Sequence, residues 1–383
     1  MITITFEELF TYKNIYRAHL KGRKCKRRKR PLVRFEMATI SHISDIYERL
    51  HAGKFKVGRY SKFTVEVPKK REIQTQPYEN RVVQHVLCDN ILAPYFTQRA
   101  ILDNAACQKG KGTHFALERF EKSLQAYVTN HGVTGYFLEC DILKYFPSIP
   151  HKRLKQIICP HIADERIRQM IEDIIDSYHT KPTFLDRYEI PYLHNETEET
   201  GRGVPIGNQT SQIFGMFYLN TVDRLVKERL RIKVYSRFMD DWVLVHEDIN
   251  YINYAFEAIK KAVRYLGLQL NTKTQIFPLK NGVTFLGYRF IINPEGTVVK
   301  TKDTTRTVKK GREVVRTVKK TTKKRIRQRA ALLKKAYLDG IIPIERVNAS
   351  LAAFHGHLKH GKNVQFEEEL HGKLTFETEE ETE

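Results

Sequence analysis

The chain has 383 residues, with 66 Lys and Arg against 44 Asp and Glu, and its formal net charge at pH 7 is +22. So large a positive excess is typical of a protein that binds a polyanion, and a chain of this length can bury the core of two or three domains. Its five cysteines form no Cys-x-x-Cys pair and no apolar run reaches the roughly 18 residues of a membrane span, which argues against a disulfide framework, a zinc site and a membrane protein, and favours a cytoplasmic location.

Helical periodicity marks the start of the chain. Residues 6–20 predict one helix, and residues 35–51 predict a second that ends before Gly53. The run between them, residues 21–30, is almost entirely basic, and we expect it to contact a phosphate backbone; a solvated loop is the alternative. We assign residues 1–60 to an N-terminal basic helical segment.

A strand pair and a long helix follow. Residues 63–73 alternate in the manner of two strands joined by a basic turn, and residues 76–92 predict an amphipathic helix. Residues 103–117 then form a Gly-rich, Lys-bearing loop that opens another helix, where backbone N–H groups can hold a phosphate. The spacing of its glycines and lysines is not that of a P-loop, so we do not expect a nucleotide hydrolase.

Two acidic segments carry the main chemical signal. Residues 135–140 predict an apolar strand that delivers Asp141 at its end, and residues 235–245 predict a tight β-hairpin with Asp240 and Asp241 at its tip. Adjacent carboxylates repel one another, and unless they occupy an ordinary solvated turn, a divalent metal ion relieves the repulsion. One carboxylate at a strand end and a pair on a neighbouring hairpin form the minimal scaffold for two metal ions about 4 Å apart.

The segment between the carboxylates is mostly helical. Residues 151–178 predict helices, residues 181–200 a loop with an acidic end, and residues 201–212 a Gly-rich turn before an apolar helix. Glycines in such a turn let the backbone approach a flat ligand closely. Beyond the hairpin, residues 252–266 predict a further helix.

The C-terminal part contains a second basic block, residues 300–329, in which the pattern of residues 306–310 recurs in residues 316–320. Its alternation predicts a two-stranded ribbon that binds nucleic-acid backbone through Lys309, Lys310, Lys319 and Lys320. Residues 323–338 and 344–358 predict an amphipathic helical pair, whose His355, His357 and His360 we expect to face a duplex rather than zinc. From Glu367 onward the tail is acidic, and we expect it to be disordered alone and able to fold back on the basic surface.

The two acidic segments, in this order and at this separation, resemble palm motifs A and C of reverse transcriptases, and the Gly-rich turn between them occupies the place of motif B. The form Ile206-Gly-Asn-Gln-Thr-Ser-Gln212, with residues 110–117 and 141–149, is most similar to the reverse transcriptases of diversity-generating retroelements. The likeness covers roughly residues 40–290. It implies an α+β right-hand polymerase that copies a structured RNA into DNA, with synthesis that can be error-prone opposite template adenines.

The resemblance also implies roles for individual residues. Asp141, Asp240 and Asp241 would be catalytic and would hold two Mg²⁺ ions with the backbone carbonyl of Ile142, and Mn²⁺ could substitute. The implied nucleotide-binding residues are Arg71 and Lys70 over the triphosphate, Phe146 as a steric gate against a ribose 2′-hydroxyl, Gly207 and Gln212 at the nascent pair, and Lys273 as a proton donor to pyrophosphate. The implied nucleic-acid contacts are Lys109 and Lys111 on the template backbone, and Phe285, Gly287 and Tyr288 as the primer grip.

The resulting domain plan has five parts: residues 1–60, fingers 61–135, palm 136–290 with a finger-like insertion at about 151–200, a basic ribbon and helical thumb 291–365, and an acidic tail 366–383. Phe238 stands where the family usually has Tyr, and we expect reduced or altered activity rather than loss. The expected partners are an RNA template or non-coding RNA, a DNA or RNA primer, deoxynucleotides, and an accessory protein or an oligomer, but no membrane. Two alternatives remain: a phage-defence enzyme, including template-independent or protein-primed synthesis, and a non-catalytic RNA-binding protein with a polymerase fold.

Overall fold

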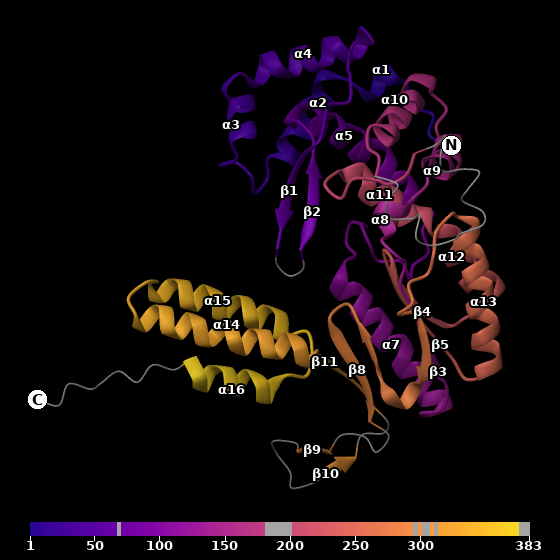
Figure 1. The fold of residues 1–383 in the computed structure, drawn as a ribbon, viewed down its shortest axis with the longest axis vertical. Coiled ribbons are helices and arrows are strands. Elements are labelled where there is room, and N and C mark those ends of the chain that lie inside the picture. The colour runs from indigo at the N-terminus through magenta and orange to yellow at the C-terminus, as the bar shows by residue number, and fades with distance from the viewer. Residues whose placement is uncertain (67–69, 181–200, 294–297, 301–306, 310–312, 375–383) are drawn as a thin grey trace, which may run out of the picture. The chain divides into compact units, whose positions relative to one another are not determined.

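The computed structural model of the chain describes residues 1–66, 70–180, 201–293, 298–300, 307–309 and 313–374. Helices and antiparallel strand pairs alternate along it, so the predicted α+β class is confirmed (Figure 1). Residues group into two compact units. The first comprises Met1–Gly112, Cys140–Arg231 and Ala255–Thr274, and the second comprises Thr113–Glu139, Ile232–Tyr254 and Gln275–Glu383.

The first unit is mainly helical. Its elements are α1 (Phe6–Leu9), α2 (Tyr12–Gly22), α3 (Arg30–Met37), α4 (Thr39–His51), β1 (Ser61–Val65), β2 (Arg71–Thr75), α5 (Tyr78–Leu87), α6 (Ala93–Thr97), α8 (Tyr145–Ser148), α9 (His151–Ile158), α10 (Glu165–Asp176), α11 (Gln209–Tyr218) and α12 (Asn220–Arg224). Helix α13 (Ile249–Tyr265) has residues in both units. The predicted strand pair is confirmed, since β1 and β2 pair antiparallel from Ser61 opposite Thr75 to Val65 opposite Arg71, while residues 67–69 of the turn lie outside the described residues.

Caps divide the N-terminal helices more finely than the periodicity predicts. Thr5 and Glu8 form a capping box at the start of α1, and the side chain of Thr11 caps α2, so the single helix predicted over residues 6–20 is two. Ala38 likewise leaves helical geometry and separates α3 from α4. Helix α4 does end before Gly53, as predicted, and that glycine has a φ of 67°.

The second unit contains the larger sheets. Its elements are α7 (Thr113–His131), β3 (Tyr136–Cys140), β4 (Val234–Phe238), β5 (Asp241–His246), β6 (Gln275–Pro278), β7 (Val283–Phe285), β8 (Tyr288–Asn293), β9 (Val298–Lys300), β10 (Thr307–Lys309), β11 (Glu313–Val318), α14 (Lys320–Leu338), α15 (Ile344–Leu358) and α16 (Val364–Leu374). One sheet has the order β4-β5-β3-β6 and another β11-β8-β7, while β9 pairs with β10. Helix α7 packs on this unit through Phe120, whose ring contacts those of Phe285 and Phe290.

The ribbon predicted from the repeated basic pattern is wrong in its pairing. The strand of the first copy, β10, pairs with β9, whereas the strand of the second copy, β11, pairs with β8 over six residues. The apolar residues Val314 and Val318 explain the difference, because their side chains are buried in the three-stranded sheet and a solvent-exposed ribbon would leave them in water. Two equal charge patterns therefore have two different structural environments.

The predicted helical pair of the C-terminal part is present as α14 and α15, and a third helix, α16, was not predicted. It includes the first residues of the acidic tail, and Phe366 and Leu370 on it are buried. Glu369 accepts two hydrogen bonds from the guanidinium of Arg327 on α14, at 2.9 and 2.6 Å. The start of the tail is thus helical and packed on a basic helix, while residues 375–383 lie outside the described residues. No helix in the described part is long and apolar enough to cross a membrane.

A buried histidine in the first unit makes stability depend on pH. His19 is 1% exposed, its Nδ1 lies 3.0 Å from the hydroxyl of Tyr78, and burial lowers its pKa below 6.5; Arg23 adds to this shift and Glu36 opposes it. Because the pKa of His19 is lower in the folded protein, the unfolded chain binds a proton at this histidine more readily than the folded one. The contribution of neutral His19 to stability is therefore present above pH 6.5 and is lost as the pH falls through the native pKa.

We therefore expect the melting temperature to fall from pH 7 to pH 5, and to fall less steeply in His19→Asn, which keeps a polar group near Tyr78 but does not titrate. The additional stability that the wild type loses over the whole titration should be about 1.4 kcal/mol for each unit by which the native pKa is lowered. Thermal melts of both proteins across this pH range measure it, and parallel curves would contradict the prediction.

Candidate catalytic site

Asp240 and Asp241 lie at the tip of the β4–β5 hairpin, as predicted. Phe238 pairs with Asp241, so the loop consists of Met239 and Asp240, and both aspartates are half-buried. Met239 has a φ of 61°, a strained value for a residue with a bulky side chain. The fully buried Arg237 donates from Nη1 to the carbonyl oxygen of Met239 at 2.9 Å, which holds this strained backbone in place.

Asp141 follows β3 directly, also as predicted, and is half-buried. The Nδ2 group of Asn271 donates to Asp141 Oδ2 at 2.9 Å, and the N–H of Asn271 donates to the carbonyl oxygen of Asp141 at 2.8 Å. The hydroxyl of Thr274 lies 3.4 Å from both the N and the O of Asp141. Ile142, next in the chain, is buried and bridges to Leu270.

The sheet order makes β3 and β5 hydrogen-bonded neighbours. Asp141 comes immediately after β3, and Asp241 is the first residue of β5. Their hard oxygen donors are of the kind that Mg²⁺ prefers. Among the described residues, however, no group of three or more His, Cys, Asp or Glu side chains is arranged to hold a metal ion.

The Gly-rich turn before α11 is seated on strand β2. A Cβ atom on Gly207 would lie 1.7 Å from the carbonyl oxygen of Gln74, so no larger residue fits there without moving the strand. The N–H of Ile206 donates to the side-chain oxygen Oε1 of the same Gln74 at 3.4 Å. Asn208 donates to the hydroxyl of Tyr60 at 2.8 Å. The close approach that the structure shows at this turn is to the chain's own backbone, and the approach to a ligand stays a prediction.

A chain of buried amides connects the same two regions. Thr210 on α11 donates to Gln84, the Nε2 of Gln84 donates to Gln76 at 2.5 Å, and Gln76 donates to the carbonyl oxygen of Gly58 at 3.0 Å. Because these buried polar groups are hydrogen-bonded to one another, the network fixes the relative position of α5, α11 and the base of the β1–β2 hairpin.

Two further predicted nucleotide contacts lie on α8 and α11. The ring of Phe146 is half-buried, and its Cε1 atom would be 3.0 Å from a Cβ on Gly215 of α11, so the ring is held against that helix. Gln212 is also half-buried and accepts a hydrogen bond from the thiol of Cys107 at 3.3 Å. Burial raises the pKa of this thiol to about 11, which keeps it protonated and able to donate near neutral pH.

The predicted basic contacts of the first unit are accessible. Lys70, Arg71, Lys109 and Lys273 are exposed, and Lys111 is partly exposed. Arg71 opens β2, and the N–H of Lys273 donates to Asn271 Oδ1 at 3.1 Å. Of the basic contacts predicted in the second unit, Lys319 and Lys320 lie at the start of α14 and Lys309 lies in β10, while Lys310 lies outside the described residues.

The predicted aromatic-glycine turn lies between β7 and β8. Leu286 and Gly287 both have positive φ, at 48° and 88°, as a two-residue hairpin loop requires. The rings of Phe285 and Tyr288 are buried, and the Tyr288 hydroxyl donates to the carbonyl oxygen of His357 at 2.8 Å. Leu286 and Gly287 therefore form the tip of the turn, and the two rings are buried on either side of it in the chain.

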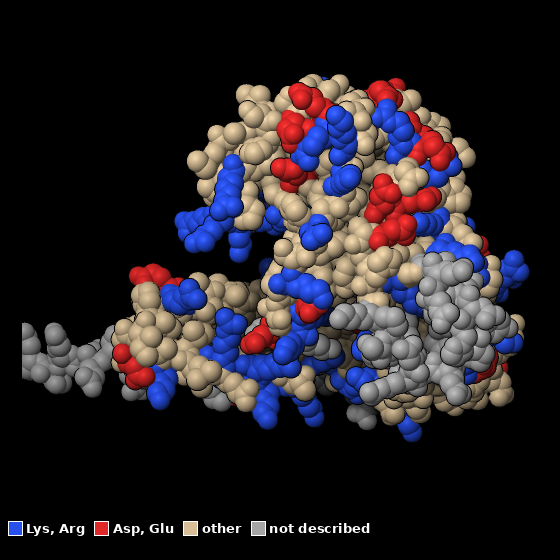
Figure 2. Space-filling model, turned by 45° about the horizontal axis from the view of Figure 1, so that its top comes forward, with Lys and Arg blue, Asp and Glu red and all other residues tan. Residues whose placement is uncertain are grey.

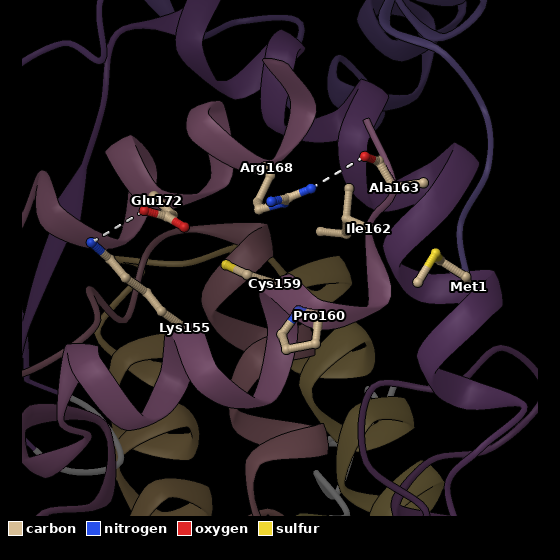
Figure 3. Close-up of a pocket in the computed structure, with 8 residues that line it drawn as sticks. All are labelled: Met1, Lys155, Cys159, Pro160, Ile162, Ala163, Arg168 and Glu172. Carbon is tan, nitrogen blue, oxygen red and sulfur yellow. Dashed lines mark hydrogen bonds and ion pairs between the residues drawn. The ribbon is translucent and has the colours of Figure 1, made fainter. Parts of the chain in front are cut away.

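A surface pocket of about 540 Å³ lies elsewhere in the first unit (Figure 3). Its charged groups are engaged with the chain, since Lys155 pairs with Glu172 at 3.7 Å and Arg168 donates to the carbonyl oxygen of Ala163 at 3.2 Å. Burial raises the pKa of the Cys159 thiol to about 12, so it supplies no nucleophile near neutral pH. None of the predicted site residues lines this pocket, and it does not contribute to the site.

Lys and Arg side chains form several groups on the face drawn in Figure 2. From the end of α2 to the start of α3, Arg23 pairs with Glu36, but most of the basic residues are exposed: Lys21, Lys24, Lys26, Arg27, Arg28, Lys29 and Arg30. Such a segment can attract a phosphate backbone with an affinity that depends strongly on salt.

Several residues of the site were not identified from the sequence. Arg237 could have been found, because a charged residue within an otherwise apolar strand needs a buried partner. No sequence pattern marks Asn271, Gln74 or Cys107, because each contacts a residue far away in the chain; Asn271 and its partner Asp141 are separated by 130 positions.

The profile of the family described as "Reverse transcriptase (RNA-dependent DNA polymerase)" matches residues 68–290, which is more than half of the chain. The chain belongs to this family. It is therefore an RNA-directed DNA polymerase, a nucleotidyltransferase that uses an RNA template and nucleotide substrates. The matched region includes Asp141, Asp240, Asp241, Gly207 and Asn271. A comparison with curated proteins found no match.

Proposed function

We propose that the chain extends a primer on an RNA template by two-metal nucleotidyl transfer, with Asp141, Asp240 and Asp241 as the metal ligands and the carbonyl oxygen of Ile142 as a further donor. This proposal is supported by the chain positions of the carboxylates: Asp141 directly follows β3, Asp241 opens β5, and β3 and β5 are neighbours in the sheet order. Two Mg²⁺ ions, or Mn²⁺ with the same oxygen donors, would activate the primer 3′-hydroxyl and offset the charge of the leaving pyrophosphate.

The other residues would bind and orient the substrates. Arg71 and Lys70 would contact the triphosphate, Gly207 and Gln212 the nascent base pair, and Lys273 would protonate the pyrophosphate. Lys109 and Lys111 would hold the template backbone. In this proposal residues 61–135 are the fingers, 136–290 the palm and 291–365 the thumb of a right-hand polymerase.

We further propose a prokaryotic retroelement as the setting, with a structured RNA as template and a small accessory protein as partner in the cytoplasm. The motif B form with Ile206 and Gln212, which resembles diversity-generating enzymes, supports this assignment and favours error-prone copying of template adenines.

The test is primer extension by the purified protein on a defined RNA, with Mg²⁺ and the four deoxynucleotides, followed by sequencing of the DNA. Complementary DNA with errors clustered at template adenines is the expected product. Accurate copying would contradict the diversifying role. DNA whose sequence is unrelated to the template would point to untemplated synthesis and a defence role.

Phe146 is expected to set the choice of sugar. Replacing it by Val removes the ring that rests on Gly215 and opens space for a ribose 2′-hydroxyl, so we expect the preference for deoxynucleotides over ribonucleotides to fall by about tenfold to a hundredfold. The ratio of kcat/KM for dCTP and CTP within the same preparation measures this, and it cancels any loss of folded protein. An unchanged ratio would show that Phe146 only packs against α11.

A further inference from the structure

Asn271 links the carboxylate of Asp141 to the backbone of Lys273. Its Nδ2 donates to Asp141 Oδ2 at 2.9 Å and its Oδ1 accepts from the N–H of Lys273 at 3.1 Å. We propose that Asn271 is a positioning residue that orients Asp141 for metal binding and, through the same carboxamide, sets the place of Lys273 relative to it. This inference rests on the proposed function of Asp141 and Lys273.

Main-chain contacts hold the carboxamide in this position. The N–H of Asn271 donates to the carbonyl oxygen of Asp141 at 2.8 Å, Ile142 bridges to Leu270, and the N–H of Leu143 donates to Gln269 at 2.9 Å. Residues 141–143 and 269–271 therefore run as a short paired segment, although they are far apart in the chain. The side-chain contact follows from this pairing and does not depend on a long, flexible side chain.

The chemistry of the two ends of the carboxamide fits their partners. The amide nitrogen is a donor and faces a carboxylate, while the amide oxygen is an acceptor and faces an N–H; the flipped rotamer would set like against like at both ends. A neutral donor can restrain a carboxylate without forming an ion pair that competes with a metal ion for its charge. Groups that orient metal ligands in this way usually change metal affinity or activity by about 10-fold to 100-fold when removed.

Two substitutions separate the two ends. Asn271→Ala removes both hydrogen bonds, whereas Asn271→Asp keeps the acceptor for Lys273 and replaces the donor with a second carboxylate beside Asp141. If the bond to Asp141 matters, both variants lose synthesis. Asn253→Ala is the matched control, because Asn253 is an exposed asparagine whose amide donates within its own helix, to the carbonyl oxygen of Ile249.

The experiment measures Mn²⁺ binding by electron paramagnetic resonance of the free ion, without nucleic acid or nucleotide, and the Mg²⁺ dependence of primer extension. We expect Asn271→Ala to weaken Mn²⁺ binding and to raise the half-saturating Mg²⁺ concentration by about tenfold or more, with the deoxynucleotide KM at saturating Mg²⁺ little changed. Asn253→Ala should match the wild type in each measurement. Wild-type Mg²⁺ dependence in both Asn271 variants would overturn the inference.

Thermal melts establish that each variant is folded, and Asn271→Asp decides the question if Asn271→Ala does not fold. Asp141→Asn separates this inference from the proposed function. If Asp141→Asn loses Mn²⁺ binding and synthesis while the Asn271 variants behave as wild type, only the positioning role fails. If Asp141→Asn keeps both, the proposed function of Asp141 fails.

Discussion

Replacing Asp240 and Asp241 together by Ala is expected to lower the rate of DNA synthesis by at least about a thousandfold, equivalent to ~4 kcal/mol of transition-state stabilisation. The two side chains stand on the β4–β5 turn at the end of the strand beside β3, and they are the paired donors of the proposed metal site. The rate of primer extension under single-turnover conditions, at saturating Mg²⁺ and nucleotide, measures the loss.

The chain supplies a matched control at the other end of the same strand. Glu247 and Asp248 are also adjacent acidic residues; they follow β5 and are exposed, so their double Ala variant changes the net charge by the same amount. It loses the ion pair between Glu247 and His131 and the hydrogen bond from the N–H of Asn250 to Asp248, but no residue of the proposed site. This control should synthesise DNA at a rate close to that of the wild type.

Measuring the affinity for RNA tests whether the loss of DNA synthesis comes from the chemical step and not from weaker RNA binding. Removing two negative charges from a protein with a net charge of +22 should leave its RNA affinity equal or slightly higher, and equally so in both double variants. Loss of synthesis with intact RNA binding in the Asp240/Asp241 variant alone supports the proposed site. Substantial synthesis by that variant would place the chemistry elsewhere in the chain.

The features that sequence reasoning predicted are local ones. The hairpin at residues 235–245, the strand before Asp141 and the loop that opens α7 all follow from alternation or turn residues within a few positions, and the structure contains each of them. Helix ends were less accurate, because a cap such as Thr11 can interrupt a continuous apolar face.

The features that sequence reasoning missed depend on partners far away in the chain. Strand β11 carries the same basic pattern as β10, yet its partner is β8, because Val314 and Val318 are buried against that sheet. Helix α16 lies in a segment that composition marks as acidic, and two apolar residues, Phe366 and Leu370, decide its packing. The overall composition of a segment reflects its most frequent residues. It therefore does not reveal a few apolar residues whose burial determines how the segment packs.

Gly207→Ala is expected to be strongly disruptive for a comparable reason, since the constraint comes from a distant strand. A Cβ atom at this position would lie 1.7 Å from the carbonyl oxygen of Gln74, and a distance under about 3 Å is not tolerated by real Cβ atoms. The obstructing atom belongs to the main chain of β2, so no side-chain rotation relieves the clash. Either β2 or the turn before α11 has to move.

Movement of this kind would also disturb the contacts that join the two regions. The N–H of Ile206 donates to Gln74 Oε1, and Asn208 donates to the hydroxyl of Tyr60. Burial raises the pKa of Tyr60, so this hydroxyl is protonated near neutral pH. Overpacking of a tight contact typically costs about 1–3 kcal/mol, and here we expect a lower melting temperature together with a higher KM for deoxynucleotides, because β2 carries Arg71.

Gly356→Ala is the matched control: it adds the same methyl group, but we expect no loss of stability. Gly356 lies within helix α15 and a Cβ there would have no neighbour within 4 Å, so alanine should be neutral or should stabilise the protein by up to about 1 kcal/mol. Melting temperatures and steady-state kinetics of the two variants measured side by side test the argument. Equal melting temperatures and equal KM values would mean that the Gly-rich turn does not rest on β2, and that the resemblance of residues 206–212 to motif B has a cause other than this close approach.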